Sequence, residues 1–132
     1  MLRLLVTTLT AAAIAFPALA GNIASSVDPA TLSEKQKTSL GLYLSPADAH
    51  AALQADPGIV FIDVRSPLEI EFIGTAQGMD QNIPFATKKL TYNNESKGYN
   101  WTPNPDFVVQ VRALLAREGK TESDPVFVMC RS

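Results

Sequence analysis

Continuous apolar runs mark the predicted strands of this chain. Ile59–Ile62 and Val126–Met129 each hold four apolar residues in succession, and Gly41–Leu44 is a further short apolar run. Runs without polar alternation are typical of strands that are covered on both faces, as in parallel sheets. Asn82–Phe85 is a candidate for one more short strand. The hydrophobic pattern therefore predicts several short buried strands spread along the chain.

Polar residues followed at once by proline mark the starts of three predicted helices. Ser45, Ser66 and Asn104 are each placed to cap a helix whose first residue is proline, and Glu69 completes a capping box with Ser66. The third helix ends at Gly119 and has one apolar face, made of Phe107, Val111, Leu114 and Leu115. Strands that alternate with helices predict an α/β fold, with a parallel sheet covered by helices on both faces.

The first residues of the chain resemble an export signal. Residues 1–20 contain one basic residue, Arg3, then an apolar stretch and the small-residue pattern Ala18-Leu19-Ala20. This pattern is typical of a secretory signal peptide cleaved after Ala20, and its apolar stretch is too short for a membrane span. We therefore expect an exported, most often periplasmic protein with no stable membrane insertion. Residues 21–40 are predicted to be a flexible lead-in to one domain over residues 41–132.

A long polar segment separates the second and third predicted helices. Ala86–Pro103 reads as an irregular insertion, and Tyr92, Tyr99 and Trp101 are its aromatic residues. Two interpretations stay open: the segment covers a site with its aromatic side chains, or it is a surface insertion whose Trp101 packs on the sheet.

Charge and cysteine content limit the possible functions. Removing residues 1–20 takes away one of the 11 basic residues and none of the 13 acidic ones, which leaves a net charge of −3. A mildly acidic chain without a basic cluster gives no indication of nucleic-acid binding. No metal-ligand cluster or phosphate-binding glycine motif is present in the sequence, so no cofactor is implied. Cys130 is the only cysteine, so these residues alone cannot form an intrachain disulfide.

Two polar segments directly follow predicted strands. Asp63-Val64-Arg65 follows Ile59–Ile62, and Cys130-Arg131-Ser132 follows Val126–Met129. Ligands of open parallel sheets bind beyond the carboxyl ends of the strands. A cysteine in that place is a nucleophile when it is a thiolate, which an adjacent guanidinium favours. The structural alternatives are a cysteine that acts as a small buried hydrophobe and an aspartate that caps a loop.

These segments carry a resemblance to a known family. The stretch FIDVRSPLEIEFIGTAQGMDQNIPF resembles the first signature of rhodanese-like domains, and VFVMCRS resembles the strand and first residues of their active-site loop. The resemblance covers residues 41–132, nearly all of the chain after the signal. It implies a rhodanese-like parallel α/β sheet that carries a catalytic cysteine.

The resemblance also implies an activity and a set of site residues. Cys130 would accept a sulfane sulfur from a small donor such as thiosulfate and would pass it, as a persulfide, to cyanide or another thiol. Arg131 and Ser132 would begin the anion-binding cradle. Asp63 and Arg65 would support the neighbouring loop.

Two residues are candidates for the acidic partner of Arg65. Glu69 and Glu71 both lie near the position of the acidic residue of the family. The chain also departs from the family, because Gly74-Thr75 stands where Gly-His is common. In the family the active-site loop continues into a helix, a strand and a further helix. We therefore expect this sequence to be a fragment that is truncated inside the active-site loop.

Two other classes of function stay open at this stage. Certain phosphatases and arsenate reductases share this architecture, with a longer active-site loop that holds a tetrahedral oxyanion. A binding module without catalysis is the other alternative, and the aromatic residues of Ala86–Pro103 motivate it.

The expected truncation predicts low stability and no turnover for residues 21–132. A chain that lacks part of its sheet buries too little apolar surface to offset the conformational entropy of folding. We expect thermal unfolding of this fragment, followed by circular dichroism, to be broad and weakly cooperative. A sharp cooperative transition would show that the expectation is wrong.

Overall fold

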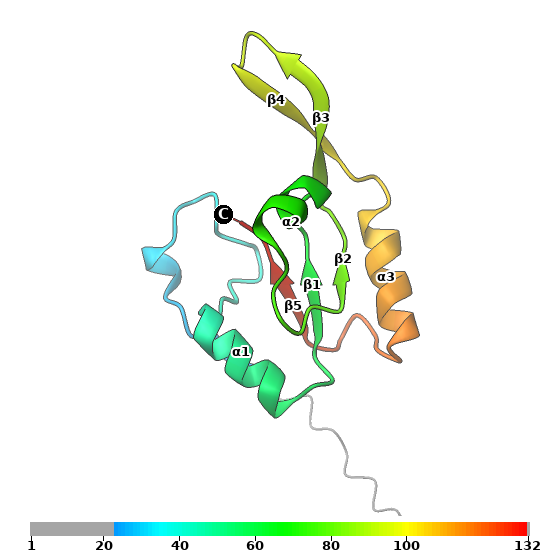
Figure 1. Cartoon of the computed structure of the whole chain (residues 1–132). Helices are drawn as coiled ribbons and strands as arrows, with labels where there is room; N and C mark the ends of the chain where they lie inside the picture. The colour runs from blue at the N-terminus through cyan, green and yellow to red at the C-terminus, as the bar shows by residue number, and fades with distance from the viewer. Residues whose placement is uncertain (1–22, 132) are drawn as a thin grey trace, which may run out of the picture.

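The structure is a computed structural model that describes residues 23–131 (Figure 1). The predicted signal peptide and Ser132 lie outside the described residues. In chain order, the elements are a 3₁₀ helix η1 (Pro29–Thr31), α1 (Pro46–Ala55), β1 (Val60–Asp63), α2 (Pro67–Ile73), β2 (Gln81–Asn82), β3 (Ala86–Asn93), β4 (Gly98–Pro103), α3 (Phe107–Arg117) and β5 (Val126–Met129). Helices separate the strands of the sheet except where β2, β3 and β4 follow one another, and the α/β class predicted from the sequence is confirmed.

Three strands form a parallel sheet in the order β2-β1-β5. The central strand β1 is paired in parallel with β2 on one side and with β5 on the other. Its four residues are all buried, and three of them belong to the apolar run that predicted a buried strand. The parallel sheet is therefore confirmed, and the carboxyl ends of β1 and β5 lie at the same edge.

The core lies between the sheet and α3. Val60 and Ile62 of β1 cluster with Ile83, Leu114 and Leu115. Because successive side chains of a strand point to opposite faces, Ile59 and Phe61 lie on the other face of β1. On that side Ile59 shares the lining of a hollow with Leu53 and other residues of α1. Figure 1 accordingly shows α1 and α3 on opposite sides of the three strands.

Helix starts follow the capping residues that the sequence predicts. The Ser45 hydroxyl accepts a hydrogen bond from the backbone N–H of Asp48, and Ser66 forms the predicted capping box with Glu69. The third helix begins later than predicted, at Phe107. Asn104 instead accepts from the backbone N–H of Asp106 and so closes a turn before α3.

The strand predicted over residues 41–44 is absent from the described part of the chain. Tyr43 donates its backbone N–H to the Ser25 hydroxyl at 3.0 Å. Its carbonyl accepts from the backbone N–H of Ser26 at 2.8 Å. The lead-in thus satisfies the backbone of Tyr43 without a ladder of strand hydrogen bonds. This element of the sequence prediction is wrong.

The irregular loop predicted over residues 86–103 is also wrong, because this segment forms an antiparallel hairpin of β3 and β4. Lys88 lies opposite Trp101, and the Tyr92 and Tyr99 rings, 5.5 Å apart, meet edge to face. Such cross-strand pairs stabilise a two-stranded ribbon even where its sequence is polar. The turn contains Lys97, the only residue other than glycine with a positive φ among residues 23–131.

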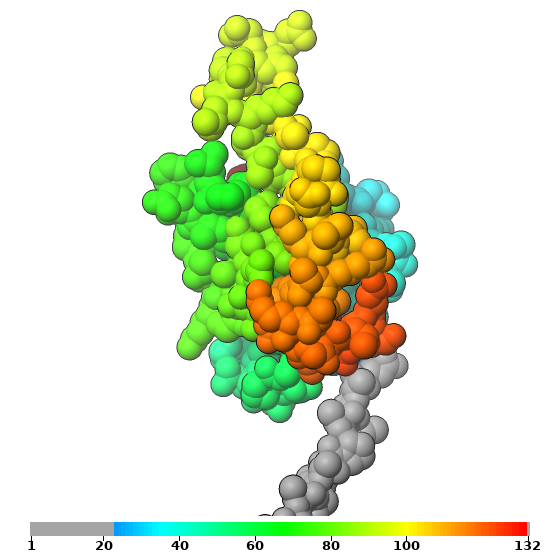
Figure 2. Space-filling view, turned by 90° about the vertical axis from the view of Figure 1, so that its right-hand side faces the viewer, coloured from blue at the N-terminus to red at the C-terminus, as the bar shows by residue number. Residues whose placement is uncertain are grey.

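The hairpin extends away from the body of the protein (Figure 2). Its base is held where the Phe85 and Phe107 rings meet edge to face, 5.3 Å apart, and where the Asn104 side chain donates to the Pro84 carbonyl. Several large apolar side chains of this region are exposed: Phe85, Leu90, Tyr92, Tyr99 and Trp101. The hairpin thus presents apolar surface that the described part of the chain does not cover.

The small core predicts which substitutions unfold the protein. Leu114 is 1 % exposed and belongs to the core cluster, so Leu114→Ala is expected to lower the free energy of unfolding by about 2–5 kcal/mol. Leu90→Ala, the same change on the exposed hairpin, is expected to alter it by less than about 0.5 kcal/mol. Urea unfolding of both variants, made in the protein expressed from its complete reading frame, measures the difference. Equal effects would contradict the packing described above.

Candidate functional site

The candidate site lies at the carboxyl edge of the parallel sheet. Asp63 and Met129, the last residues of β1 and β5, are paired across the two strands. The backbone N–H of Val64 donates to the Met129 carbonyl at 2.9 Å, which continues the pairing past the end of β1. Cys130 and Arg131 therefore leave the sheet beside the segment Val64-Arg65, and Cys130 is exposed. The third predicted cradle residue, Ser132, lies outside the described residues.

A buried ion pair orders the loop after β1. The Arg65 guanidinium donates to both carboxylate oxygens of Asp63, with Nε at 3.0 Å from each of them. The same carboxylate accepts the backbone N–H of Arg65 at 3.0 Å. Asp63 is fully buried and Arg65 nearly so. The pair holds the three residues of the loop in one conformation.

Arg65 also connects this loop to the turn after α2. Its guanidinium donates to the Gly74 carbonyl at 2.9 Å, and Gly74 adopts a positive φ of 87° at the end of the helix. The hydrogen bonds to Asp63 raise the pKa of Arg65 and outweigh the opposing effect of its burial. Arg65 thus stays charged and joins two segments that flank the candidate site.

Asn82 is a positioning residue that had no role among the predicted site residues. Its side-chain amide donates to the carbonyls of Asp63 and Arg65, both at 2.8 Å. Asn82 lies in the stretch FIDVRSPLEIEFIGTAQGMDQNIPF, which was used only for the resemblance to the family. Asn82 lies on β2 and reaches the loop that follows β1. This contact can be predicted only when β2 is known to be the neighbour of β1 in the sheet. Asn82 completes the support of the segment 63–65.

The structure separates the two candidate glutamates. The carboxylate of Glu69 accepts the backbone N–H and the hydroxyl of Ser66, at 2.9 and 2.8 Å. Its second oxygen lies 3.9 Å from the Arg131 guanidinium. Glu71 is exposed on α2. Glu69 therefore faces the candidate site, and the direct carboxylate partner of Arg65 is Asp63.

The pKa of Glu69 is lowered by its surroundings. Burial alone raises the pKa of this carboxyl, but the hydrogen bonds from Ser66 lower it more, together with the positive charges of Arg131 and Arg65. The side chain of Glu69 is 17 % exposed. An anionic Glu69 thus lies between the start of α2 and Arg131.

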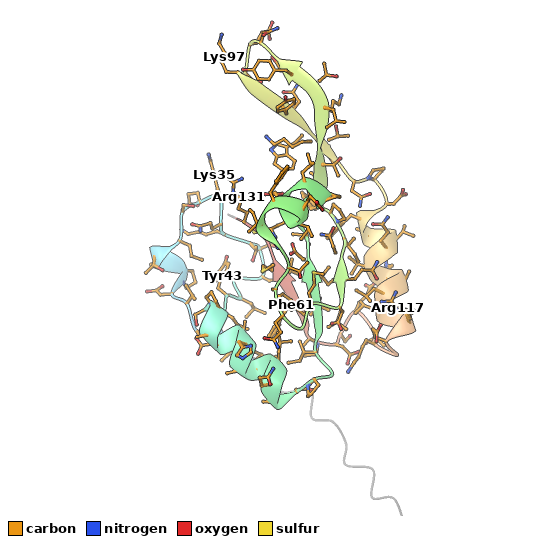
Figure 3. The ribbon with its side chains drawn as sticks, viewed as in Figure 1. Lys35, Tyr43, Phe61, Lys97, Arg117 and Arg131 are labelled. Carbon is orange, nitrogen blue, oxygen red and sulfur yellow. The ribbon has the colours of Figure 1, made fainter. Side chains whose placement is uncertain are left out.

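A groove lies beside Arg131, between α2 and the base of the hairpin. Its volume is about 270 Å³, and it is lined by Ser66, Leu68, Glu69, Phe72, Ile73, Lys88, Trp101 and Arg131. Figure 3 shows Arg131 next to α2, with Lys97 at the far tip of the hairpin. Trp101 thus lines a groove beside Arg131.

Within residues 23–131, no group of three or more His, Cys, Asp or Glu side chains is placed to hold a metal ion. No helix in this part of the chain is long and apolar enough to cross a membrane.

Comparisons with protein-family models, curated proteins and solved structures found no match to this chain.

The two glutamates offer a matched test of this geometry. Glu69→Gln is expected to destabilise the protein by about 1 kcal/mol, because it removes a charged acceptor at the start of α2. Glu71→Gln is expected to have an effect below about 0.5 kcal/mol. Because folding lowers the pKa of Glu69, the contribution of its charge is full above the pKa of the unfolded carboxyl. That contribution disappears as the pH falls through the folded value.

Urea unfolding of the protein expressed from its complete reading frame, at neutral and at acidic pH, measures both effects. The wild type and Glu69→Gln should differ at neutral pH and converge at acidic pH. A difference that persists in acid, or an equal loss in Glu71→Gln, would contradict the assignment of Glu69.

Proposed function

We propose that this chain is an exported, periplasmic sulfurtransferase of the rhodanese-like kind, with Cys130 as its nucleophile. The observation that carries the proposal is topological: Cys130 and Arg131 follow β5 at the sheet edge where the loop of Asp63 and Arg65 follows β1. Ligands of open parallel sheets bind at this edge. The resemblance of both segments to the family supplies the reaction.

The first half of the proposed reaction transfers a sulfur atom to Cys130. The Cys130 thiolate attacks the outer, sulfane sulfur of thiosulfate, and a new S–S bond forms to Sγ. The S–S bond of thiosulfate breaks, and sulfite leaves with the electron pair. Cys130 becomes a persulfide, and no external oxidant or reductant is consumed.

Arg131 is proposed to hold the anions of this reaction. Its side chain is 74 % exposed, so it can approach an incoming thiosulfate or the persulfide. Glu69, 3.9 Å from the guanidinium, keeps Arg131 close to the start of α2. Ser132 is proposed to extend this cradle. Asp63 and Arg65 are positioning residues, because they fix the neighbouring loop without contacting the anion.

The second half of the reaction passes the sulfur on. A thiophilic acceptor, cyanide or a thiolate, attacks the outer sulfur of the persulfide. The bond between Sγ and that sulfur breaks, and Cys130 leaves as a thiolate that is ready for another cycle. No cofactor takes part in either half.

Thiocyanate formation tests the proposal. The protein expressed from its complete reading frame, without residues 1–20, is expected to convert thiosulfate and cyanide to thiocyanate. Cys130→Ser should abolish this turnover, and Arg131→Ala should lower kcat/KM for thiosulfate by about 10- to 100-fold because a charged anion contact is lost. Glu71→Gln is the control variant and should keep wild-type rates.

Two outcomes would overturn the proposal. Turnover that survives Cys130→Ser would remove Cys130 from the chemistry. Hydrolysis of an aryl phosphate that depends on Cys130, without any thiocyanate formation, would instead support the oxyanion chemistry that other proteins with this architecture perform.

A further inference from the structure

We propose that the hairpin of β3 and β4 is a dimerisation arm, which joins the hairpin of a second copy of this chain edge to edge along β4. This role does not depend on the proposed sulfur transfer. Figure 1 and Figure 2 both show the hairpin standing away from the body of the protein. An isolated ribbon of two strands is marginally stable in water, and further strands stabilise it. Two hairpins joined in this way form one sheet in the order β3-β4-β4-β3.

The outer edge of β4 suits the addition of a strand. Among the described residues β4 is paired only with β3, and its six residues, Gly98–Pro103, include no charged side chain. The register of β3 shifts between Lys88 and Tyr92, and the adjacent lysines Lys88 and Lys89 lie on this strand. Irregular and charged edges resist pairing with another chain. The second copy is therefore expected on β4.

Two residues of β4 direct their backbone groups to this outer edge. The backbone N–H of Asn104 donates to the Phe85 carbonyl at 2.9 Å, so Asn104 faces β3. Residues that face the neighbouring strand alternate with residues that face away. Trp101 and Tyr99 are three and five residues before Asn104, so both face away from β3. The Tyr99 carbonyl accepts from the Lys88 ammonium at 3.2 Å, and its second lone pair can accept another hydrogen bond.

The spacing of the two aromatic residues fits a two-fold axis at Asn100. When Asn100 lies opposite Asn100 of the second copy, Tyr99 lies opposite Trp101 of that copy and Trp101 opposite its Tyr99. These residues face outward, so each pair exchanges backbone hydrogen bonds. Tyr99 is 47 % exposed and Trp101 is 49 % exposed, so both have surface left to cover. Cross-strand aromatic pairs stabilise a sheet, and a two-fold contact has to be self-complementary in this way.

The charges of two copies complement each other in this register. Lys88 and Lys89 lie on β3, at the outside of the joined sheet. Lys97 lies opposite Pro103 of the second copy, at the end of the sheet where Asp106 of that copy precedes α3. Lys97 and Asp106 are exposed, and neither forms an ion pair within residues 23–131. Complementary charges of this kind favour one register over others.

The contact is small, so the expected dimer is reversible. An aromatic side chain buries about 150–250 Å², and each copy contributes two that are about half exposed. Together with the backbone of one strand, this area is below the roughly 800 Å² per partner of a standard interface. We expect a dissociation constant on the order of 10–100 µM, as for other small interfaces.

A cysteine at the axis tests the register. Asn100→Cys is made with Cys130→Ser in the protein expressed from its complete reading frame without residues 1–20. Mild oxidation should yield a disulfide-linked dimer, because Cα atoms at the axis lie about 4.5 Å apart, within the range that a disulfide spans. Asn94→Cys, the same change at the hairpin tip, is the control. Its two copies would lie more than about 30 Å apart and should not cross-link.

Sedimentation velocity of uncross-linked protein provides the second measurement. Asn100→Asp places two carboxylates opposite each other at the axis, so the dissociation constant should rise by about tenfold or more. The Asn93 amide, which donates to the Asn100 side chain at 3.3 Å, can donate to the new carboxylate, so each hairpin is kept. Gln54→Glu adds the same charge on α1 and should change the constant by less than about twofold. Lys97→Glu should weaken the dimer, and adding Asp106→Lys should restore it.

Three results would overturn the inference. The first is a protein that stays monomeric at about 500 µM, well above the expected constant. The second is equal cross-linking of Asn100→Cys and Asn94→Cys. The third is a monomer whose Trp101 fluorescence shifts on vesicles of phosphatidylglycerol, which would assign the hairpin to a membrane surface. A dimer with the expected cross-link in protein that forms no thiocyanate would support the inference and overturn only the proposed function.

Discussion

The ion pair between Asp63 and Arg65 is the interaction on which the candidate site depends. It lies at the end of the central strand, where a buried carboxylate binds a guanidinium and a backbone N–H at once. Removing one partner of such a pair leaves an uncompensated buried charge, at a cost of about 3–5 kcal/mol. The Arg65 guanidinium also holds the turn after α2 through the Gly74 carbonyl. The Asn82 amide of β2 binds the Asp63 carbonyl and so holds the loop from the neighbouring strand. The loop beside Cys130 is thus held rigidly.

Local sequence signals predicted much of this arrangement. Ser45 and Ser66 determine where two helices start, because a hydroxyl followed by proline satisfies the first backbone N–H groups. The apolar runs of β1 and β5 predicted a parallel sheet, and therefore placed Asp63 and Cys130 at one edge. Each of these signals is contained within a few consecutive residues, so it can be recognised without knowledge of the fold.

Features that depend on long-range pairing were not predicted. The hairpin was missed because its strands are polar, and the pairs Lys88–Trp101 and Tyr92–Tyr99 become apparent only when the strands are paired, with a register shift between the two pairs. The strand expected over residues 41–44 fails because Tyr43 bonds to the lead-in instead of to a strand. The groove combines residues from α2, the hairpin and the end of β5. Only the folded chain brings them together.

The proposed function depends on the transfer of a sulfane sulfur to Cys130, which mass spectrometry can detect. The protein from its complete reading frame is incubated with thiosulfate alone, and its thiols and persulfides are then alkylated. The mass of the peptide that contains Cys130 is measured by mass spectrometry. We expect a species heavier by one sulfur atom that disappears when cyanide is added. A Cys130 peptide that gains no sulfur, in protein shown by circular dichroism to be folded, would contradict the proposed function.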